Sequence, residues 1–197
     1  MPRIGSVAVF CGAQRGRDPR PLAAAEALGH GLATAGRRLV YGGGRVGMMG
    51  ALADAALSAG GEVVGVIPEF LTRREVAHSG LTRLLVTESM HARKQQMFAL
   101  ADAFVMLPGG LGTLDETVEI ITWRQLGLSD KPVLLCAVAG SATPLLDAID
   151  AIIAAGFADS SVHSLFEIAD GVPAVLERLD QLEPAAPRAA ADDPERL

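Results

Sequence analysis

Short apolar runs alternate with longer segments of helical periodicity along most of this chain. Several of the runs are apolar on both sides, as the central strands of a parallel sheet are. The strands predicted from this pattern span residues 6–11, 38–41, 62–67, 83–86, 103–107, 133–138 and, more weakly, 165–168. The predicted helices span residues 20–35, 47–59, 89–101, 113–126, 143–155 and 172–182.

Regular alternation of strand and helix predicts an α/β fold with a doubly wound parallel sheet, about seven strands and helices on both faces. Such sheets bind ligands outside the carboxyl ends of their strands. The 197 residues are enough for one domain with a well-buried core, which we expect over residues 1–182. Residues 183–197 are rich in Ala, Pro, Asp and Arg without periodicity, and we expect a disordered tail there.

Glycine-rich turns follow the first, second and fifth predicted strands, so all three fall at the carboxyl edge of the sheet. The third turn, from Pro108 to Gly112, carries the clearest chemistry. Its glycines remove Cβ atoms where backbone N–H groups must approach an anion, and the start of the next helix adds unpaired N–H donors. The turn is therefore expected to hold a phosphate group.

The second turn, residues 42–50, lacks the features of a dinucleotide-binding fingerprint. That fingerprint belongs to the first strand–helix unit and needs an acidic residue about 20 positions further on. Here the first unit carries only Gly12, and the second strand ends in Tyr41. We expect Gly43 and Gly44 to form a wall of the ligand pocket, and Gly50 to allow close packing of a helix.

Thr113 and Glu116 directly follow the glycines of the third turn, and two interpretations fit them. In the first, Thr113 donates to a phosphate oxygen and Glu116 acts on the bound molecule. In the second, the two residues form a capping box at the start of the helix. The capping box alone leaves the three glycines and the proline before it unexplained.

The segment from Met90 to Lys94 begins the helix between the fourth and fifth strands. Arg93 shares one helical face with Met90 and Met97, and it can clamp a phosphate or pair with Glu116. Lys94 fits a solvated side chain as well as a functional one. His91 has no second His or Cys at metal-ligand spacing, so we expect no metal site.

Charge and composition exclude several classes of partner. The net charge of −6 without a basic block argues against nucleic acid, and no stretch approaches the ~20 apolar residues of a membrane span. We therefore expect a cytoplasmic protein with no membrane contact. Its two cysteines, Cys11 and Cys136, lie in apolar runs that suit reduced core thiols. Only two lysines, Lys94 and Lys131, stand beside fifteen arginines.

These motifs together resemble a known family. Residues 108–116 (PGGLGTLDE), 90–94 (MHARK), 41–44 (YGGG) and 122–127 (TWRQLG) are similar to the LOG family, the cytokinin riboside 5′-monophosphate phosphoribohydrolases. The resemblance runs from about Val7 to Ile168. It implies a Rossmann-like fold, a homodimer with active sites near the subunit interface, and hydrolysis of the N-glycosidic bond of a nucleoside 5′-monophosphate without a cofactor. The apolar segment around Trp123 also favours a dimer.

The resemblance assigns roles to particular residues and leaves the base open. It implies that Arg93 and Glu116 are the catalytic pair. The base could be adenine, an N6-isopentenyl-type adenine or another purine. The resemblance also implies that residues 109–113 hold the phosphate and that Glu75 contacts the substrate. The full set of predicted substrate-binding residues is Glu75, Lys94, Gly43, Gly44, Gly109, Gly110, Leu111, Gly112, Thr113, Leu114 and Asp115.

Two functions of other classes stay open beside this hydrolase. A pyridoxal-dependent decarboxylase needs a Schiff-base lysine, and Lys131 is predicted at the wrong edge of the sheet for that role. A non-catalytic carrier of a nucleotide or of the molybdenum cofactor, on the same fold, would bind tightly without turnover. The presence of both Arg93 and Glu116 favours the enzyme, because a carboxylate stabilises the oxocarbenium-like charge that develops when a C1′–N bond breaks.

Overall fold

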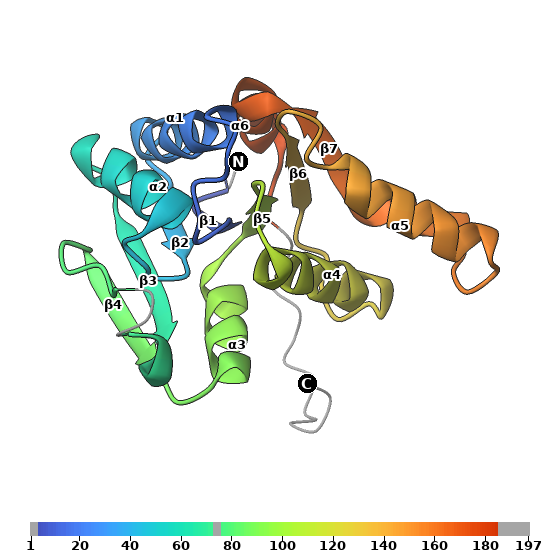
Figure 1. The fold of residues 1–197 in the computed structure, drawn as a ribbon, viewed down its shortest axis with the longest axis horizontal. Helices are drawn as coiled ribbons and strands as arrows, with labels where there is room; N and C mark the ends of the chain where they lie inside the picture. The colour runs from blue at the N-terminus through green and yellow to red at the C-terminus, as the bar shows by residue number, and fades with distance from the viewer. Residues whose placement is uncertain (1–3, 73–75, 185–197) are drawn as a thin grey trace.

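The computed structural model describes residues 4–72 and 76–184, and its seven strands form one parallel sheet (Figure 1). The strand order is β4-β3-β2-β1-β5-β6-β7. The predicted α/β class and the number of strands are thus confirmed. The tail expected at residues 183–197 lies outside the described residues from 185 onward. The strands are β1 (Ser6–Phe10), β2 (Arg38–Tyr41), β3 (Val63–Pro68), β4 (Arg83–Thr87), β5 (Ala103–Met106), β6 (Val133–Ala137) and β7 (Glu167–Asp170).

Six α-helices of the described chain cover the two faces of this sheet. Their bounds agree with the predicted segments to within two residues. The weakest prediction, a strand at 165–168, is displaced by two residues because a 3₁₀-helix, η2 (Ser160–Leu165), occupies its start. A second 3₁₀-helix, η1 (Glu69–Leu71), follows β3. The α-helices are α1 (Arg20–Thr34), α2 (Gly47–Ser58), α3 (Met90–Leu100), α4 (Leu111–Gln125), α5 (Thr143–Ala154) and α6 (Gly171–Gln181).

Two hydrophobic cores form because neighbouring residues of a strand point to opposite faces of the sheet. On β1, Val7 and Val9 face the core built with α1, α2 and α6, whereas Ala8 and Phe10 face the core that includes residues of α3, α4 and α5. Both sets are almost completely buried. This three-layer arrangement accounts for the two-sided apolar runs of the sequence.

The chain changes direction across the sheet between β1 and β5. From β1 it winds outward to β4, and α3 then leads it back to β5 beside β1, from where it winds outward to β7. The connections that follow β1 and β5 therefore lead to opposite halves of the sheet, and the switch point between them is where doubly wound sheets bind ligands. The turn from Pro108 to Gly112, which the sequence predicts to hold a phosphate group, follows β5 and lies at this point.

Two further findings concern the helices and the cysteines. None of the described helices has the length and apolar character needed to cross a membrane. Cys11 and Cys136 are both buried and free, as the sequence predicted. Burial of the Cys136 thiol raises its pKa to about 12, and the nearby charge of Asp170 adds to this.

The contact between α1 and α2 depends on Gly29, and this gives a test of the fold. A Cβ atom at Gly29 would lie 2.1 Å from the backbone oxygen of Leu52, which cannot move without shifting α2. We expect Gly29→Ala to lower the free energy of unfolding by about 1–3 kcal/mol, the usual cost of overpacking. Urea denaturation measures this.

Gly112→Ala is the matched control, because a Cβ atom at this other helical glycine would meet nothing within 4 Å. Alanine also favours helix over glycine by up to about 1 kcal/mol. The control should be as stable as the wild type or more so. Equal stability of the Gly29→Ala variant and the wild type would contradict this account of the α1–α2 contact.

Candidate active site

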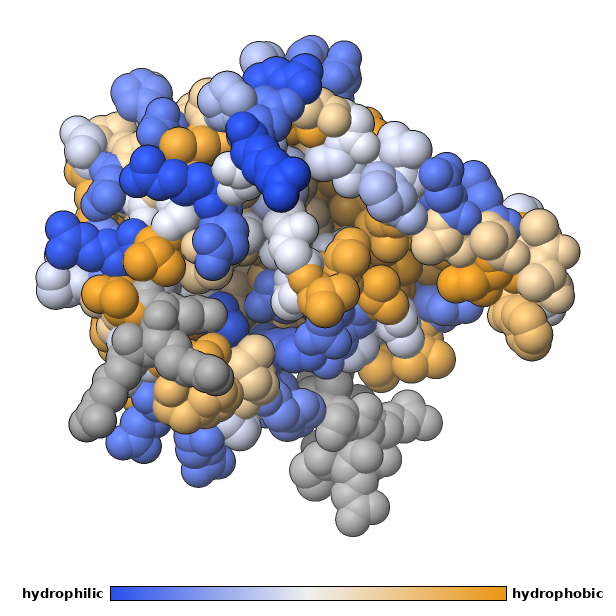
Figure 2. Space-filling view, viewed as in Figure 1, coloured by the Kyte–Doolittle hydropathy of each residue, from blue (hydrophilic) through white to orange (hydrophobic). Residues whose placement is uncertain are grey.

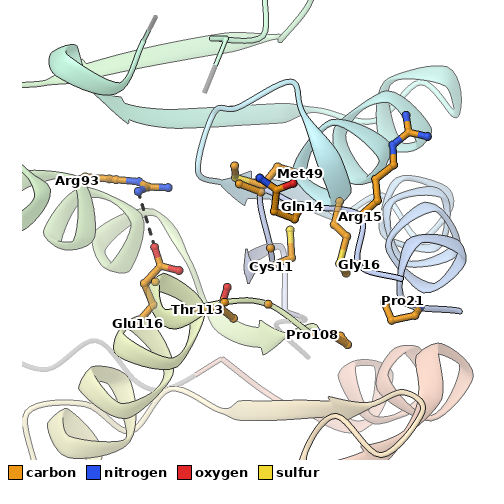
Figure 3. Close-up of a pocket in the computed structure, with 16 residues that line it drawn as sticks. Cys11, Gln14, Arg15, Gly16, Pro21, Met49, Arg93, Pro108, Thr113 and Glu116 are labelled. Atoms are coloured by element: carbon orange, nitrogen blue, oxygen red, sulfur yellow. Dashed lines mark ion pairs between the residues drawn. The ribbon is translucent and has the colours of Figure 1, made fainter. Parts of the chain in front are cut away.

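A cavity of about 510 Å³ opens at the carboxyl edge of the sheet, at the switch point between β1 and β5. Its volume lies within the range of small-molecule sites. In Figure 3, Arg93 and Glu116 lie at one end of the cavity, Thr113 and Gln14 lie in the middle, and Arg15 and Pro21 lie toward the other end. The lining residues are Cys11, Gly12, Ala13, Gln14, Arg15, Gly16, Pro21, Met48, Met49, Arg93, Pro108, Gly109, Gly110, Gly112, Thr113 and Glu116.

The glycines of the turn after β5 serve two different purposes. A Cβ atom at Gly109 would lie 2.1 Å from Thr113 Oγ1, so the turn itself requires a glycine there. The same turn is tied to the loop after β1, since the N–H of Gly12 donates to the Pro108 carbonyl at 3.1 Å. Cβ atoms at Gly110 and Gly112 would meet no protein atom within 4 Å. The space beside these two glycines is open to a ligand at the N-terminus of α4.

Helix α4 begins earlier than the sequence predicted, and this decides between the two interpretations of Thr113 and Glu116. The N-cap residue is Gly110, and it makes no side-chain capping hydrogen bond. Thr113 is therefore the third helical residue, and the capping box with Thr113 as N-cap is wrong. Both side chains lie on the inner side of the first turns of α4, where they are buried and line the cavity.

Arg93 is buried and reaches across the carboxyl edge of two strands. Its Nε donates to the carbonyl of Val66, at 3.2 Å, and its Nη2 donates to the carbonyl of Gly42, at 3.5 Å. Its Nη1 lies 3.9 Å from Oε1 of Glu116, the ion pair drawn in Figure 3. Arg93 and Glu116 are 6% and 7% exposed, so the two charges face each other largely out of water.

A cysteine lies at the floor of the same cavity. Burial raises the pKa of the Cys11 thiol well above its usual range, the charge of Glu116 raises it further, and the charge of Arg93 opposes this. The thiol is thus protonated at neutral pH and is a poor nucleophile. Glu116 and Arg93 are the ionisable groups of this end of the cavity that can act on a ligand.

The structure brings together only some of the predicted site residues. Gly109, Gly110, Gly112 and Thr113 line the cavity with Arg93 and Glu116. The remaining motif residues of α4 point elsewhere. Leu111 is 85% exposed, Leu114 borders a separate, smaller pocket beside α5, and Asp115 accepts a hydrogen bond from Lys94 Nζ outside the cavity.

The turn after β2 contacts the site through the Gly42 carbonyl, which accepts a hydrogen bond from Arg93. Gly43 packs against Ile67 with a left-handed φ of 77°, and Gly44 pairs with Ala77 in an isolated bridge. Neither glycine is among the described residues that line the cavity. Gly50 is required by the start of its own helix, since its Cβ would lie 1.9 Å from the Arg45 carbonyl oxygen, and not by the close packing of α2 on the sheet that the sequence predicted. Glu75 lies outside the described residues.

The loop after β1 contributes five lining residues that the sequence analysis did not assign: Gly12, Ala13, Gln14, Arg15 and Gly16. Its glycine turn was recognised at the correct edge of the sheet. The missing information was the strand order, which places the loops after β1 and β5 side by side. Within the described chain, no group of three or more His, Cys, Asp or Glu residues is arranged to hold a metal ion.

Comparison with known proteins identifies close relatives in sequence. The profile of the family described as "Possible lysine decarboxylase" matches residues 49–179. A cytokinin riboside 5′-monophosphate phosphoribohydrolase of Rhodococcoides fascians is 49% identical over 164 residues, 83% of either chain. An Arabidopsis thaliana protein of the same name is 39% identical over 182 residues, 92% of this chain and 85% of the relative.

Solved structures share the fold at lower identity. The molybdenum cofactor carrier protein of Chlamydomonas reinhardtii has a TM-score of 0.69 and 23% identity, over 91% of this chain and 98% of its own. At this identity the likeness speaks to the fold alone. The sequence relatives cover most of both chains. The chain therefore belongs to the LOG family of cytokinin riboside 5′-monophosphate phosphoribohydrolases.

Proposed function

We propose that this protein hydrolyses the N-glycosidic bond of adenosine 5′-monophosphates, AMP and its N6-substituted forms, to the free base and ribose 5-phosphate. The observation that carries the proposal is the buried Arg93–Glu116 pair, 3.9 Å apart, in the same cavity as the open glycines of the α4 N-terminus. The names of the relatives at 38–49% identity support the substrate class.

Binding of the phosphate positions the reacting bond of the substrate. Backbone N–H groups at the start of α4 and the Thr113 hydroxyl supply donors for its oxygens, and the open space at Gly110 and Gly112 admits it. Binding energy from this remote group can be used to hold the ribose against Glu116. Since α4 carries both the phosphate turn and Glu116, their separation is fixed by one rigid helix.

Glu116 acts on the sugar carbon. As the C1′–N bond breaks, the electron pair leaves with the base, which takes up a proton, and positive charge develops on the ribose ring. The Glu116 carboxylate stabilises that charge, and it orients the attacking water and accepts its proton as oxygen bonds to C1′. Arg93 favours the ionised form of this carboxylate, because an adjacent positive charge stabilises a negative one.

The family's description as a possible lysine decarboxylase would require a lysine in the cavity to bind a pyridoxal cofactor. Neither lysine of the chain lies there. Lys94 pairs with Asp115 and Glu119. Lys131 precedes β6 at the opposite edge of the sheet and donates to the Phe98 carbonyl at 2.7 Å. These positions favour the hydrolase.

We further propose a cytoplasmic homodimer, in which α5 provides the contact surface. None of the residues of α5 is buried although the helix is mostly apolar, and Ile152 is 47% exposed. Apolar surface gathers along α5 and the adjoining α4 in Figure 2. On α4, Leu114 and Val118 are also exposed. An apolar surface of this kind is typical of a protein interface. Trp123, by contrast, packs internally on Phe98 with ring centroids 4.7 Å apart.

The first test concerns the phosphate. We expect AMP to be hydrolysed at least about 100-fold more efficiently than adenosine, because adenosine lacks the phosphate and the charge-assisted hydrogen bonds that the phosphate makes. In Gly112→Ala, the new methyl group occupies space beside the phosphate, so kcat/KM for AMP should fall while the fold stays intact. Chromatography of the free adenine released measures the hydrolysis of AMP and of adenosine, and the activity of the variant. Equal turnover of AMP and adenosine would contradict a phosphate role for this turn.

A second test separates the charge of Glu116 from its shape. Glu116→Gln retains the size of the side chain and loses the negative charge, so kcat should fall by about 10²–10⁴-fold while AMP still binds. Glu177→Gln, an exposed change on α6, is the control and should leave kcat unchanged. A fully active Glu116→Gln enzyme would refute the mechanism.

The dimer is tested by light scattering. The wild type should have twice the mass of the 20.4 kDa chain at micromolar concentration, and Ile152→Asp on α5 should shift it toward monomer. Val86→Asp introduces the same charge at a residue of similar exposure on β4, at the other end of the sheet, and should leave the dimer intact. A monomeric wild type would refute the dimer, and a dimeric Ile152→Asp variant would refute the α5 interface.

A further inference from the structure

Lys94 forms a two-pronged contact from α3 to α4. Its Nζ lies 2.8 Å from Oδ2 of Asp115 and 3.0 Å from Oε2 of Glu119. The lysine side chain is only 16% exposed and the Glu119 side chain 24%, so the contact with Glu119 is sheltered from water, whereas the Asp115 side chain is 62% exposed. Asp115 and Glu119 are four residues apart on one face of α4, which lets a single ammonium group engage both.

On each helix, the contact is made by the sequence neighbour of a candidate catalytic residue. Lys94 follows Arg93 on α3, and Asp115 precedes Glu116 on α4. Successive helical residues point about 100° apart. Lys94 therefore reaches α4 while Arg93 reaches the strand ends, and Asp115 faces Lys94 while Glu116 faces the cavity.

Lys94 keeps its positive charge, and with it the attraction to both carboxylates, at neutral pH. Burial disfavours the charged form of Lys94, but its hydrogen bonds and charge attraction with Asp115 and Glu119 outweigh burial, and the pKa of Lys94 is raised. The Lys94 ammonium group therefore stays charged at every pH below the ordinary pKa of a lysine side chain. Without it, the carboxylates at 115, 116 and 119 would repel one another within about one turn of α4.

The opposite ends of the two helices are fixed separately, by apolar contacts. Phe98 of α3 packs edge-on against Trp123 of α4 and also stacks on Phe104 of β5 at 5.5 Å. The Lys131 ammonium lies 4.1 Å from the centre of the Phe98 ring. The aromatic contact holds one end of the α3–α4 pair, so the Lys94 contact controls the separation at the end where Arg93 and Glu116 meet.

We propose that Lys94 is a positioning residue, which sets the distance between Arg93 and Glu116 by tying α3 to α4 through Asp115 and Glu119. The inference rests on the proposed function and departs from the substrate-binding role predicted from the sequence for Lys94 and Asp115. Both side chains are engaged with each other outside the cavity. A positioning role predicts an effect on the chemical step and little effect on substrate binding.

The kinetic test uses Lys94→Met, which retains a long apolar stem without the charge. We expect kcat for AMP to fall by about 10–100-fold, as a displacement near 1 Å can cause, and KM to change less than about threefold. Lys94→Arg should recover most of the loss. The double variant Asp115→Asn/Glu119→Gln removes both carboxylate partners of Lys94, and it should lower kcat by a similar factor. Arg178→Met removes an equal charge from an ion pair with Glu167 on the far helix α6 and should leave kcat unchanged.

A raised KM with an unchanged kcat in Lys94→Met would overturn the proposal in favour of substrate binding, and unchanged values of both would overturn it outright. A crystal structure of Lys94→Met gives a readout that needs no activity. The separation of Arg93 Nη1 and Glu116 Oε1 should increase from 3.9 Å by about 1 Å. An unchanged separation would refute positioning. Absence of turnover in the wild type would instead refute the proposed function.

Discussion

A buried guanidinium must find acceptors, and at this site Arg93 finds them on three different elements. It donates to the carbonyls of Gly42, which directly follows β2, and of Val66 in β3, and it faces the Glu116 carboxylate of α4. Burying such a charge without partners would be costly, so the position of the arginine constrains all three elements at once. Gly42 makes the arrangement possible, because a Cβ atom there would lie 2.1 Å from Arg93 Nη2.

The sheet topology gives this constraint its chemical meaning. The connections after β1 and β5 lead to opposite halves of the sheet, and the turn after β5 starts the helix that carries Glu116. A phosphate at the N-terminus of α4 and a sugar carbon beside Glu116 would thus be held by one helix against one arginine. Anion and carboxylate repel each other in so small a space, and Arg93 is the buried cation of the cavity that offsets both.

Much of this could be predicted from the sequence, because the signals were local. Apolar runs and helical periodicity located the elements, and the glycine turn located Glu116 and its helix. The sequence could not reveal that the loop of Gln14 and Arg15 lines the same cavity, since this depends on which strands are neighbours. It also could not distinguish a solvated Lys94 from a bridging one, because the partners at 115 and 119 lie more than twenty residues away. The capping box failed because α4 begins two residues earlier than periodicity indicated.

The central claim is that the Arg93–Glu116 pair breaks a bond to the sugar carbon of a nucleotide held by its phosphate. Product analysis of AMP incubated with the pure wild-type protein tests this most directly, since each competing function gives a different result. The account predicts adenine and ribose 5-phosphate in equal amounts over many turnovers. Adenosine and inorganic phosphate would show that the wrong bond breaks, and AMP that is bound tightly but recovered intact would mark a carrier. Either of these results would contradict the account.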